Sequence, residues 1–265
     1  MESKRWNEDL QLALVMADQV DALTMKRFQA SDLEVFDKPD LTPVTDADKS
    51  AEALIRRHLS HSRSRDAVIG EEQGSVGLAA RRWVIDPIDG TSNYIRGVPV
   101  WATLIGLMED GKMVMGVVSA PAIGFRWWAA QGSGAWMGRS RSSAKQLKVS
   151  RITDLSQASL SYSLIGEWAE AQRLRGFMNL AQKMWRTRAY GDFWSYMLVA
   201  QGAVDVAAEP DLNLWDMGAL YPIVSEAGGK FTNLEGADGV NGPGAVVTNG
   251  RLHSQVLEFL GKPTD

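Results

Sequence analysis

Trp83-Val84-Ile85-Asp86-Pro87-Ile88-Asp89-Gly90-Thr91-Ser92-Asn93 is the stretch of this chain that decides its fold. An apolar run leads directly into two aspartates around a proline, followed by a glycine and a threonine. This order predicts a buried strand that ends in a rigid turn, with both carboxylates directed to one point. Hard divalent cations prefer such oxygen ligands, and phosphate chemistry uses such cations. For an Asp-Gly pair alone, the alternative is an ordinary turn after a strand.

The composition is that of a folded protein without cysteine chemistry. The chain has 265 residues, of which 45% are hydrophobic and 23% charged, so it can bury a sizeable core. With no cysteine, disulfides and thiolate metal sites are excluded. His58, His61 and His253 do not have the spacing of a metal-ligand motif. The net charge of −4 disfavours nucleic acid and anionic membranes as partners.

The N-terminal residues carry no targeting signal that we can identify. Residues 1–6 contain no apolar stretch, and no run in the chain approaches the length of a membrane span. We therefore expect a cytoplasmic protein that binds neither membrane nor nucleic acid.

Periodicity predicts an α+β lobe followed by a layered α/β lobe. Apolar spacing indicates helices over 6–29 and 48–59, and three strands between 103 and 130 indicate an antiparallel meander. The segment 138–144, rich in Ser and Arg, is the predicted boundary, so we divide the chain into residues 1–140 and 141–265. Beyond it, short strands alternate with helices expected near 167–184, 192–201 and 215–227.

Four acidic clusters stand at the ends of these elements: Asp46 with Asp48, Glu71 with Glu72, Asp86 with Asp89, and Asp216. Singly, each has a simple alternative, a helix cap for the aspartates and a solvated loop for the glutamates. Together they predict that the element ends converge on one crevice. Because converging carboxylates repel one another, such a site needs cations, and oxygen-only ligands favour Mg²⁺ or Mn²⁺.

Three spaced segments resemble the signatures of the inositol monophosphatase family. They are 70–72, 86–93, and 215–219 continuing through 226–229; Lys38 and residues 43–48 are similar to the family's N-terminal element. The resemblance covers about residues 38 to 230. It implies an α/β (α+β) fold, a layered α-β-α-β-α sandwich, with Mg²⁺-dependent phosphomonoesterase activity and a homodimeric assembly.

Carried over to matching positions, the resemblance implies a role for each residue. The implied ligands of two or three metal ions offer a carboxylate or carbonyl oxygen: Glu71, Asp86, the Ile88 carbonyl, Asp89 and Asp216. Asp48 is implied to act catalytically at a third, weaker metal position. Thr91 with Glu71 would orient and deprotonate the attacking water. The implied substrate contacts near the metals are Asp89, Gly90, Thr91 and Asp216, with the amides of Gly90 and Thr91 meeting phosphate.

Residues 185–215 resemble the histidinol-phosphate phosphatases of that family. Asp192 follows Gly191, and Glu209 precedes Asp216 by seven residues. These two acids predict a second negative locus, which suits the ammonium and imidazole of histidinol phosphate. The alternatives are a helix N-cap for Asp192 and a surface-loop acid for Glu209. Arg188 either contacts phosphate or braces Asp192.

We therefore expect a histidinol-phosphatase of histidine biosynthesis. One alternative is the same enzyme class with another small substrate, such as inositol monophosphate or a sugar phosphate. A second is a regulatory binding protein that keeps the fold without catalysis, although the intact set of expected ligands argues against lost catalysis.

Overall fold

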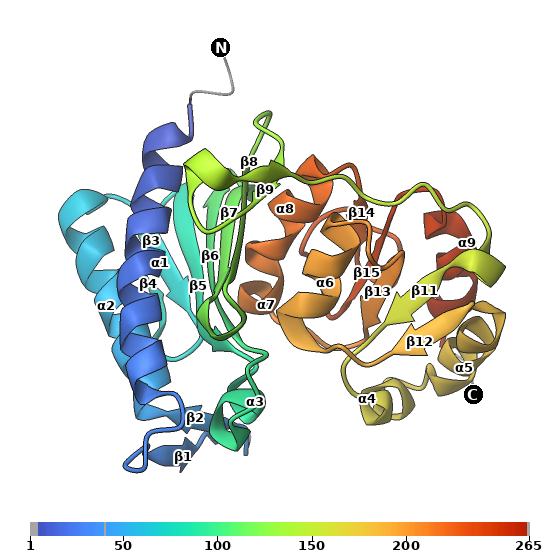
Figure 1. Cartoon of the computed structure of the whole chain (residues 1–265), viewed down its shortest axis with the longest axis horizontal. Helices are drawn as coiled ribbons and strands as arrows, with labels where there is room; N and C mark the ends of the chain where they lie inside the picture. Colours follow the sequence, from blue (N-terminus) through green and yellow to red (C-terminus); the bar gives the residue numbers. More distant parts are fainter. Residues whose placement is uncertain (1–4, 40, 264–265) are drawn as a thin grey trace.

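The computed structural model describes residues 5–39 and 41–263, which stack as helix, sheet, helix, sheet and helix layers (Figure 1). The layered α-β-α-β-α sandwich predicted from the sequence is thereby confirmed. Most of the N-terminal stretch used above for localisation, residues 1–4, lies outside the described residues. None of the helices in the described part of the chain combines the length and apolar character that a membrane crossing requires.

The larger sheet carries the aspartate turn. Its strand order over the described residues is β10-β9-β8-β7-β6-β5-β3-β4, antiparallel throughout except where β3 pairs parallel with β5. The strands are β3 (Ala67–Gly70), β4 (Gly74–Val76), β5 (Arg81–Asp89), β6 (Ala102–Glu109), β7 (Lys112–Ala120), β8 (Phe125–Ala130), β9 (Ala135–Met137) and β10 (Lys145–Gln146). The expected meander is confirmed as β6, β7 and β8. Asp110 and Gly111 join the first two with positive φ angles, as tight hairpins require.

The smaller sheet has the order β12-β11-β13-β15-β14. Its strands are β11 (Ser159–Ser161), β12 (Arg186–Arg188), β13 (Val206–Glu209), β14 (Lys230–Thr232) and β15 (Ala245–Thr248). The first three of these pair in parallel, so the ends of β11 and β13 reach the same edge of the sheet. A separate ribbon pairs β1 (Val35–Asp37) with β2 (Pro43–Thr45).

Helices form the other three layers (Figure 1). One outer layer holds α1 (Asn7–Arg27) and α2 (Asp46–Ser62), and the other holds α4 (Ile165–Glu170), α5 (Leu174–Lys183) and α9 (His253–Leu260). The layer between the sheets holds α6 (Asp192–Ala200), α7 (Leu214–Gly218) and α8 (Leu220–Glu226). The remaining helices are α3 (Thr91–Arg96) after β5 and the 3₁₀ turns η2 (Pro121–Ile123), η3 (Arg141–Ser143) and η4 (Leu155–Gln157).

The central helix layer ties the two sheets into one core. Leu104 and Trp127 of the larger sheet share a buried cluster with Phe193 of α6, Ile223 of α8 and Val247 of β15. Burying such side chains contributes about 1.5–3 kcal/mol each. The ends of β5, α6 and α7 are consequently held against one another, and these are the elements that carry the predicted acids.

Two predicted helices are each broken into two. The helix expected near 167–184 stops at α4 and resumes at α5, because Gln172 has a φ of +56° and Arg173 turns its guanidinium to the Leu260 carbonyl and Glu235. The helix expected near 215–227 divides into α7 and α8. Strand β10, which follows the predicted boundary at 140, still pairs with β9 of the larger sheet. The division into lobes 1–140 and 141–265 stays a prediction.

Gly116 of β7 tests the packing of the central layer on the larger sheet. A Cβ at this position would lie 2.1 Å from the carbonyl oxygen of Ala219, where α7 passes into α8. We expect Gly116→Ala to lower the free energy of unfolding by about 1–3 kcal/mol through overpacking. Urea unfolding of the variant measures this loss. In the control Gly166→Ala, the new Cβ meets no atom within 4 Å and lies in a helix, so stability should be unchanged or slightly raised.

Candidate active site

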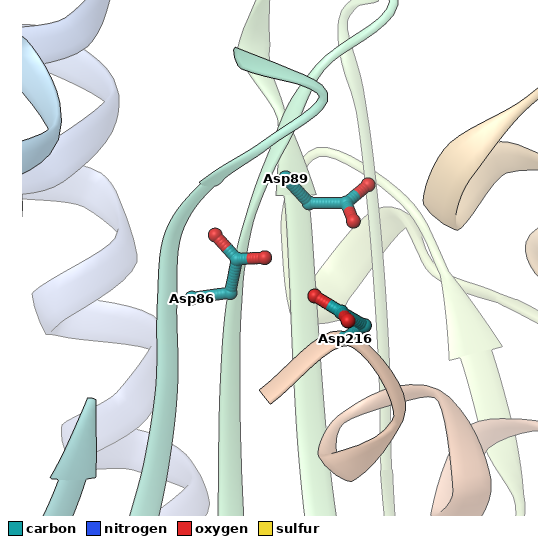
Figure 2. A group of neighbouring side chains, drawn as sticks. All are labelled: Asp86, Asp89 and Asp216. Atoms are coloured by element: carbon teal, nitrogen blue, oxygen red, sulfur yellow. The ribbon is translucent and has the colours of Figure 1, made fainter. Parts of the chain in front are cut away.

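Three aspartates from two distant parts of the chain meet at the end of β5 (Figure 2). Asp86 and Asp89 close this strand, and Asp216 lies in the first turn of α7. Oxygen atoms of the three carboxylates lie within 4.8 Å of one another. The convergence expected from the sequence is therefore present for these three residues.

The turn that carries two of the aspartates is fixed by local geometry. The pairing of β5 with β6 is irregular between Asp86 and Asp89, and Thr103 donates its hydroxyl to the Pro87 carbonyl at 2.8 Å. Gly90 has a φ of +84°, which favours glycine, and a Cβ at this position would lie 3.0 Å from the Val100 carbonyl oxygen and 3.2 Å from Asp192 Oδ2. The chain can therefore leave the strand and enter α3 at once.

Each aspartate has a defined environment before any ligand binds. Asp216 Oδ2 accepts from the Asn213 amide at 2.6 Å, and Asp89 Oδ2 accepts from the Phe193 amide at 2.8 Å. Among the described residues, the buried Oδ1 of Asp86 has no hydrogen-bond partner. An orphaned buried carboxylate oxygen beside two further carboxylates fits a cation ligand set and is otherwise costly.

Glu71, Thr91 and Asp48 surround this cluster. Glu71 lines the same cavity, and its Oε1 lies 2.6 Å from Lys38 Nζ. The Thr91 hydroxyl lies 2.9 Å from the Ile88 carbonyl oxygen and 3.1 Å from Asp48 Oδ1. Asp48 is fully buried at the start of α2, where it forms a capping box with Thr45. The structure thus brings together the residues expected at or beside the metal ions, which are Asp48, Glu71, Asp86, Ile88, Asp89, Thr91 and Asp216.

Burial and mutual repulsion raise the pKa values of these carboxyls. Burial, reinforced by neighbouring carboxylates, holds the pKa of Asp86 and of Asp89 well above the usual range. Burial also raises the pKa of Asp216 to about 7, with the charge of Glu71 adding to the effect. The pKa of Asp48 rises to about 6, again mainly through burial. In the absence of a cation, the cluster therefore holds protons near neutral pH.

A second pair of acids lies in the same cavity, which has a volume of about 540 Å³. Asp192 Oδ2 accepts from Asn93 Nδ2 at 2.8 Å, and Glu209 Oε1 accepts from the Tyr196 hydroxyl at 2.8 Å. Burial raises the pKa of Asp192 to about 6 and that of Glu209 to about 8. The cavity thus has one acidic locus at the β5 turn and another beside α6.

Both simpler alternatives for these two acids are disfavoured. The N-cap of α6 is Gly191, and the Asp192 side chain is turned toward Asn93 instead of capping the helix. Glu209 closes β13 and is only 5% exposed, which is not the environment of a surface-loop acid.

Asp48 does not itself line this cavity but contacts its lining residue Thr91. Arg188 does not line the cavity either. It ends the edge strand β12 with an exposed side chain, donates to the Thr187 carbonyl, and lines a separate small cavity. Sequence reasoning missed Ser163, which lines the main cavity and accepts from the Asp192 amide at 2.9 Å, and Tyr196. The helical spacing of Tyr196 from Asp192 was a usable signal; Ser163 had only its place after a short strand.

Comparison with known proteins gives a consistent result. The model of the inositol monophosphatase family matches residues 6–261. The histidinol-phosphatase of Streptomyces coelicolor is 58% identical over 96% of this chain and 97% of its own length, and that of Mycobacterium tuberculosis is 52% identical over 96% and 98%. Among solved structures, the extragenic suppressor protein SuhB of Bartonella henselae superposes with a TM-score of 0.89 at 25% identity, covering 97% of this chain and all of that one.

The raised pKa of Asp216 predicts a pH-dependent stability of the metal-free protein. An ordinary aspartate titrates near 4, so the folded state binds this proton more tightly than the unfolded state does. The stabilisation is complete below pH ~4 and is lost as pH rises through about 7. We expect the urea concentration at half-unfolding, measured in EDTA, to decrease as the pH is raised from 5 to 8. Added Mg²⁺ should increase this midpoint mainly at pH 8.

Asp216→Asn is the control for this effect because the amide does not titrate. Its midpoint should fall less steeply over the same pH range. A variant with the same slope as the wild-type protein would contradict the electrostatic interpretation.

Proposed function

Because this chain belongs to the inositol monophosphatase family, we propose that it is a phosphomonoesterase that hydrolyses L-histidinol phosphate to L-histidinol and phosphate. The observation that carries this proposal is one cavity with two acidic loci, the three aspartates at the β5 turn and the pair Asp192 and Glu209. The names of the two histidinol-phosphatases above support the same substrate.

We assign the first locus to metal ions. Glu71, Asp86, Asp89, Asp216 and the Ile88 carbonyl would hold two or three Mg²⁺ ions, with Mn²⁺ as an alternative. The orphaned oxygen of Asp86 and the raised pKa values of the aspartates favour cation binding. When bound, the ions supply an activated water and neutralise charge on the leaving oxygen.

The remaining residues near the turn position the reactants. The Thr91 hydroxyl donates its proton to Asp48 or to the Ile88 carbonyl, so its lone pairs are free to hold the attacking water. Glu71 accepts the proton of that water. Gly90 and Thr91 line the cavity beside the aspartates, and we assign to them contacts with the phosphate.

The second locus recognises the organic part of the substrate. Histidinol phosphate carries an ammonium close to its ester oxygen, and Asp192 and Glu209 are acids in the same cavity as the metal ligands. A cation there lowers the pKa of both carboxyls, so that each binds as a carboxylate. A charge-assisted hydrogen bond of this kind contributes about 1.5–3 kcal/mol. A neutral polyol gains much less from two such acids.

Three further parts of the proposal rest on the family alone. We place the enzyme in the cytoplasm, as a homodimer, at the dephosphorylation step of histidine biosynthesis. Sedimentation of the purified protein tests the dimer directly.

Asp89→Asn tests whether the chain is an enzyme or a binding protein. Removing one charge from the metal locus should reduce kcat/KM for histidinol phosphate by about a hundredfold or more, and EDTA should abolish phosphate release by the wild-type protein. Asp238→Asn is the control, since Asp238 pairs with Lys230 at an exposed position. Unchanged phosphate release in EDTA would exclude the metal-dependent mechanism.

Asp192→Asn tests the substrate. Loss of one charge-assisted hydrogen bond should raise KM for histidinol phosphate about tenfold to a hundredfold. KM for inositol 1-phosphate, whose organic part is neutral, should change little. Steady-state kinetics with both esters measure the difference, with the exposed Asp154→Asn as control. Equal effects on both esters would leave Asp192 a structural residue, and a wild-type preference for inositol 1-phosphate would overturn the substrate assignment.

A further inference from the structure

A fully buried glutamate lies beneath the hairpin that carries Glu71. Glu52 is one turn after Asp48 on α2, and both side chains have 0% exposure. Glu52 Oε2 accepts from the Glu72 amide at 2.8 Å, and Oε1 accepts from the Gln73 amide at 3.1 Å. One carboxylate therefore binds the two consecutive amides that follow Glu71.

Arg56 completes this arrangement from the next turn of α2. Its Nε donates to Glu52 Oε1 at 2.7 Å, and its Nη2 donates to the Gly74 carbonyl. The ion pair thus binds the β3–β4 turn through the amides of Glu72 and Gln73 and the carbonyl of Gly74. The Glu71 amide in turn donates to the Ile85 carbonyl of β5 at 3.2 Å. The backbone of Glu71 is fixed on both sides.

Turn formation alone does not require such a pair. The short strand β4 is exposed along its length, and Gln73 at the tip of the hairpin is exposed. Amides at such a tip can be satisfied by water, whereas withdrawing a carboxylate from water costs several kcal/mol before its partners offset it. The cost of burying Glu52 is explained if the β3–β4 turn must be held in one position for a function.

Gly70 allows this carboxylate to reach the turn. A Cβ on Gly70 would lie 2.3 Å from Glu52 Oε1 and 2.8 Å from Arg56 Nη2. No side chain fits between the strand and the ion pair. The close approach makes the contact sensitive to a single methyl group.

We propose that Glu52, held by Arg56, is the positioning residue for Glu71, so that metal affinity depends on a side chain that touches neither metal nor substrate. This inference rests on the proposed function, which makes Glu71 a metal ligand. Outer partners of this kind commonly change metal affinity tenfold to a hundredfold.

Glu52→Gln tests the inference because glutamine keeps the shape of the side chain but presents an NH₂ group to one of its three donors. We expect Mn²⁺, added to the full-length metal-free protein in isothermal titration calorimetry, to bind about tenfold more weakly or worse. At saturating metal, KM for histidinol phosphate should stay close to wild type. Gly70→Ala should weaken Mn²⁺ binding similarly, and the double variant should be no weaker than the more affected single variant.

Glu226→Gln is the matched control. Glu226 also accepts from two turn amides, those of Gly132 and Gly134 at 2.8 and 2.7 Å, but it lies outside the cavity of the aspartates. The Glu226→Gln variant should be less stable than the wild-type protein but should bind Mn²⁺ with the same affinity. Equal Mn²⁺ affinity in Glu52→Gln and Glu226→Gln overturns the inference. If Glu52→Gln does not fold, Gly70→Ala takes its place, and a Mn²⁺ affinity in Gly70→Ala equal to that of the wild-type protein overturns the inference. A wild-type protein that binds no Mn²⁺ refutes the proposed metal site instead.

Discussion

The repulsion among buried carboxylates is the constraint on which the rest of this molecule depends. Asp86, Asp89 and Asp216 lie within a few ångströms of one another, and burial together with their neighbours raises all three pKa values. Such a cluster lowers the free energy of unfolding, so packing elsewhere in the fold must contribute more stability than the cluster removes. The helix layer shared by the two sheets supplies it, because α6, α7 and α8 bury their side chains between the sheets and hold the acids together.

The second acidic locus depends on the same packing. Asp89 accepts from the amide of Phe193, and Asp192 accepts from Asn93 of α3. Two hydrogen bonds between residues about a hundred positions apart in sequence therefore link the two loci, one from a backbone amide and one between side chains. Under the proposed function, a phosphate ester with a cationic organic part would contact both ends of this arrangement at once, so one cavity would serve both hydrolysis and selection of the substrate.

Much of the site could be predicted from the sequence, because the acids follow apolar runs in recognisable segments. The aspartate turn and the meander follow from pattern, and resemblance marks Glu209 as a site acid, whereas its burial is visible only in the structure. Side-chain networks do not, since neither the Asn93–Asp192 contact nor the role of Ser163 has a local signature. The placement of Arg188 has no local signature either: its nearness to Asp192 in sequence does not reveal that it ends an edge strand with its side chain turned back to the Thr187 carbonyl. The break at Gln172 depends on tertiary contacts of Arg173.

The contact between Gly90 and Asp192 has a consequence for how relatives with other substrates can arise. Gly90 belongs to the turn after β5, and a Cβ added to it would lie only 3.2 Å from Asp192 Oδ2. Under the proposed function, the backbone at Gly90 would therefore limit the distance between the reacting phosphate and the side chain at position 192. Under the same proposal, exchange of the side chain at 192 would change the preferred ester while the acids of the β5 turn stay as they are.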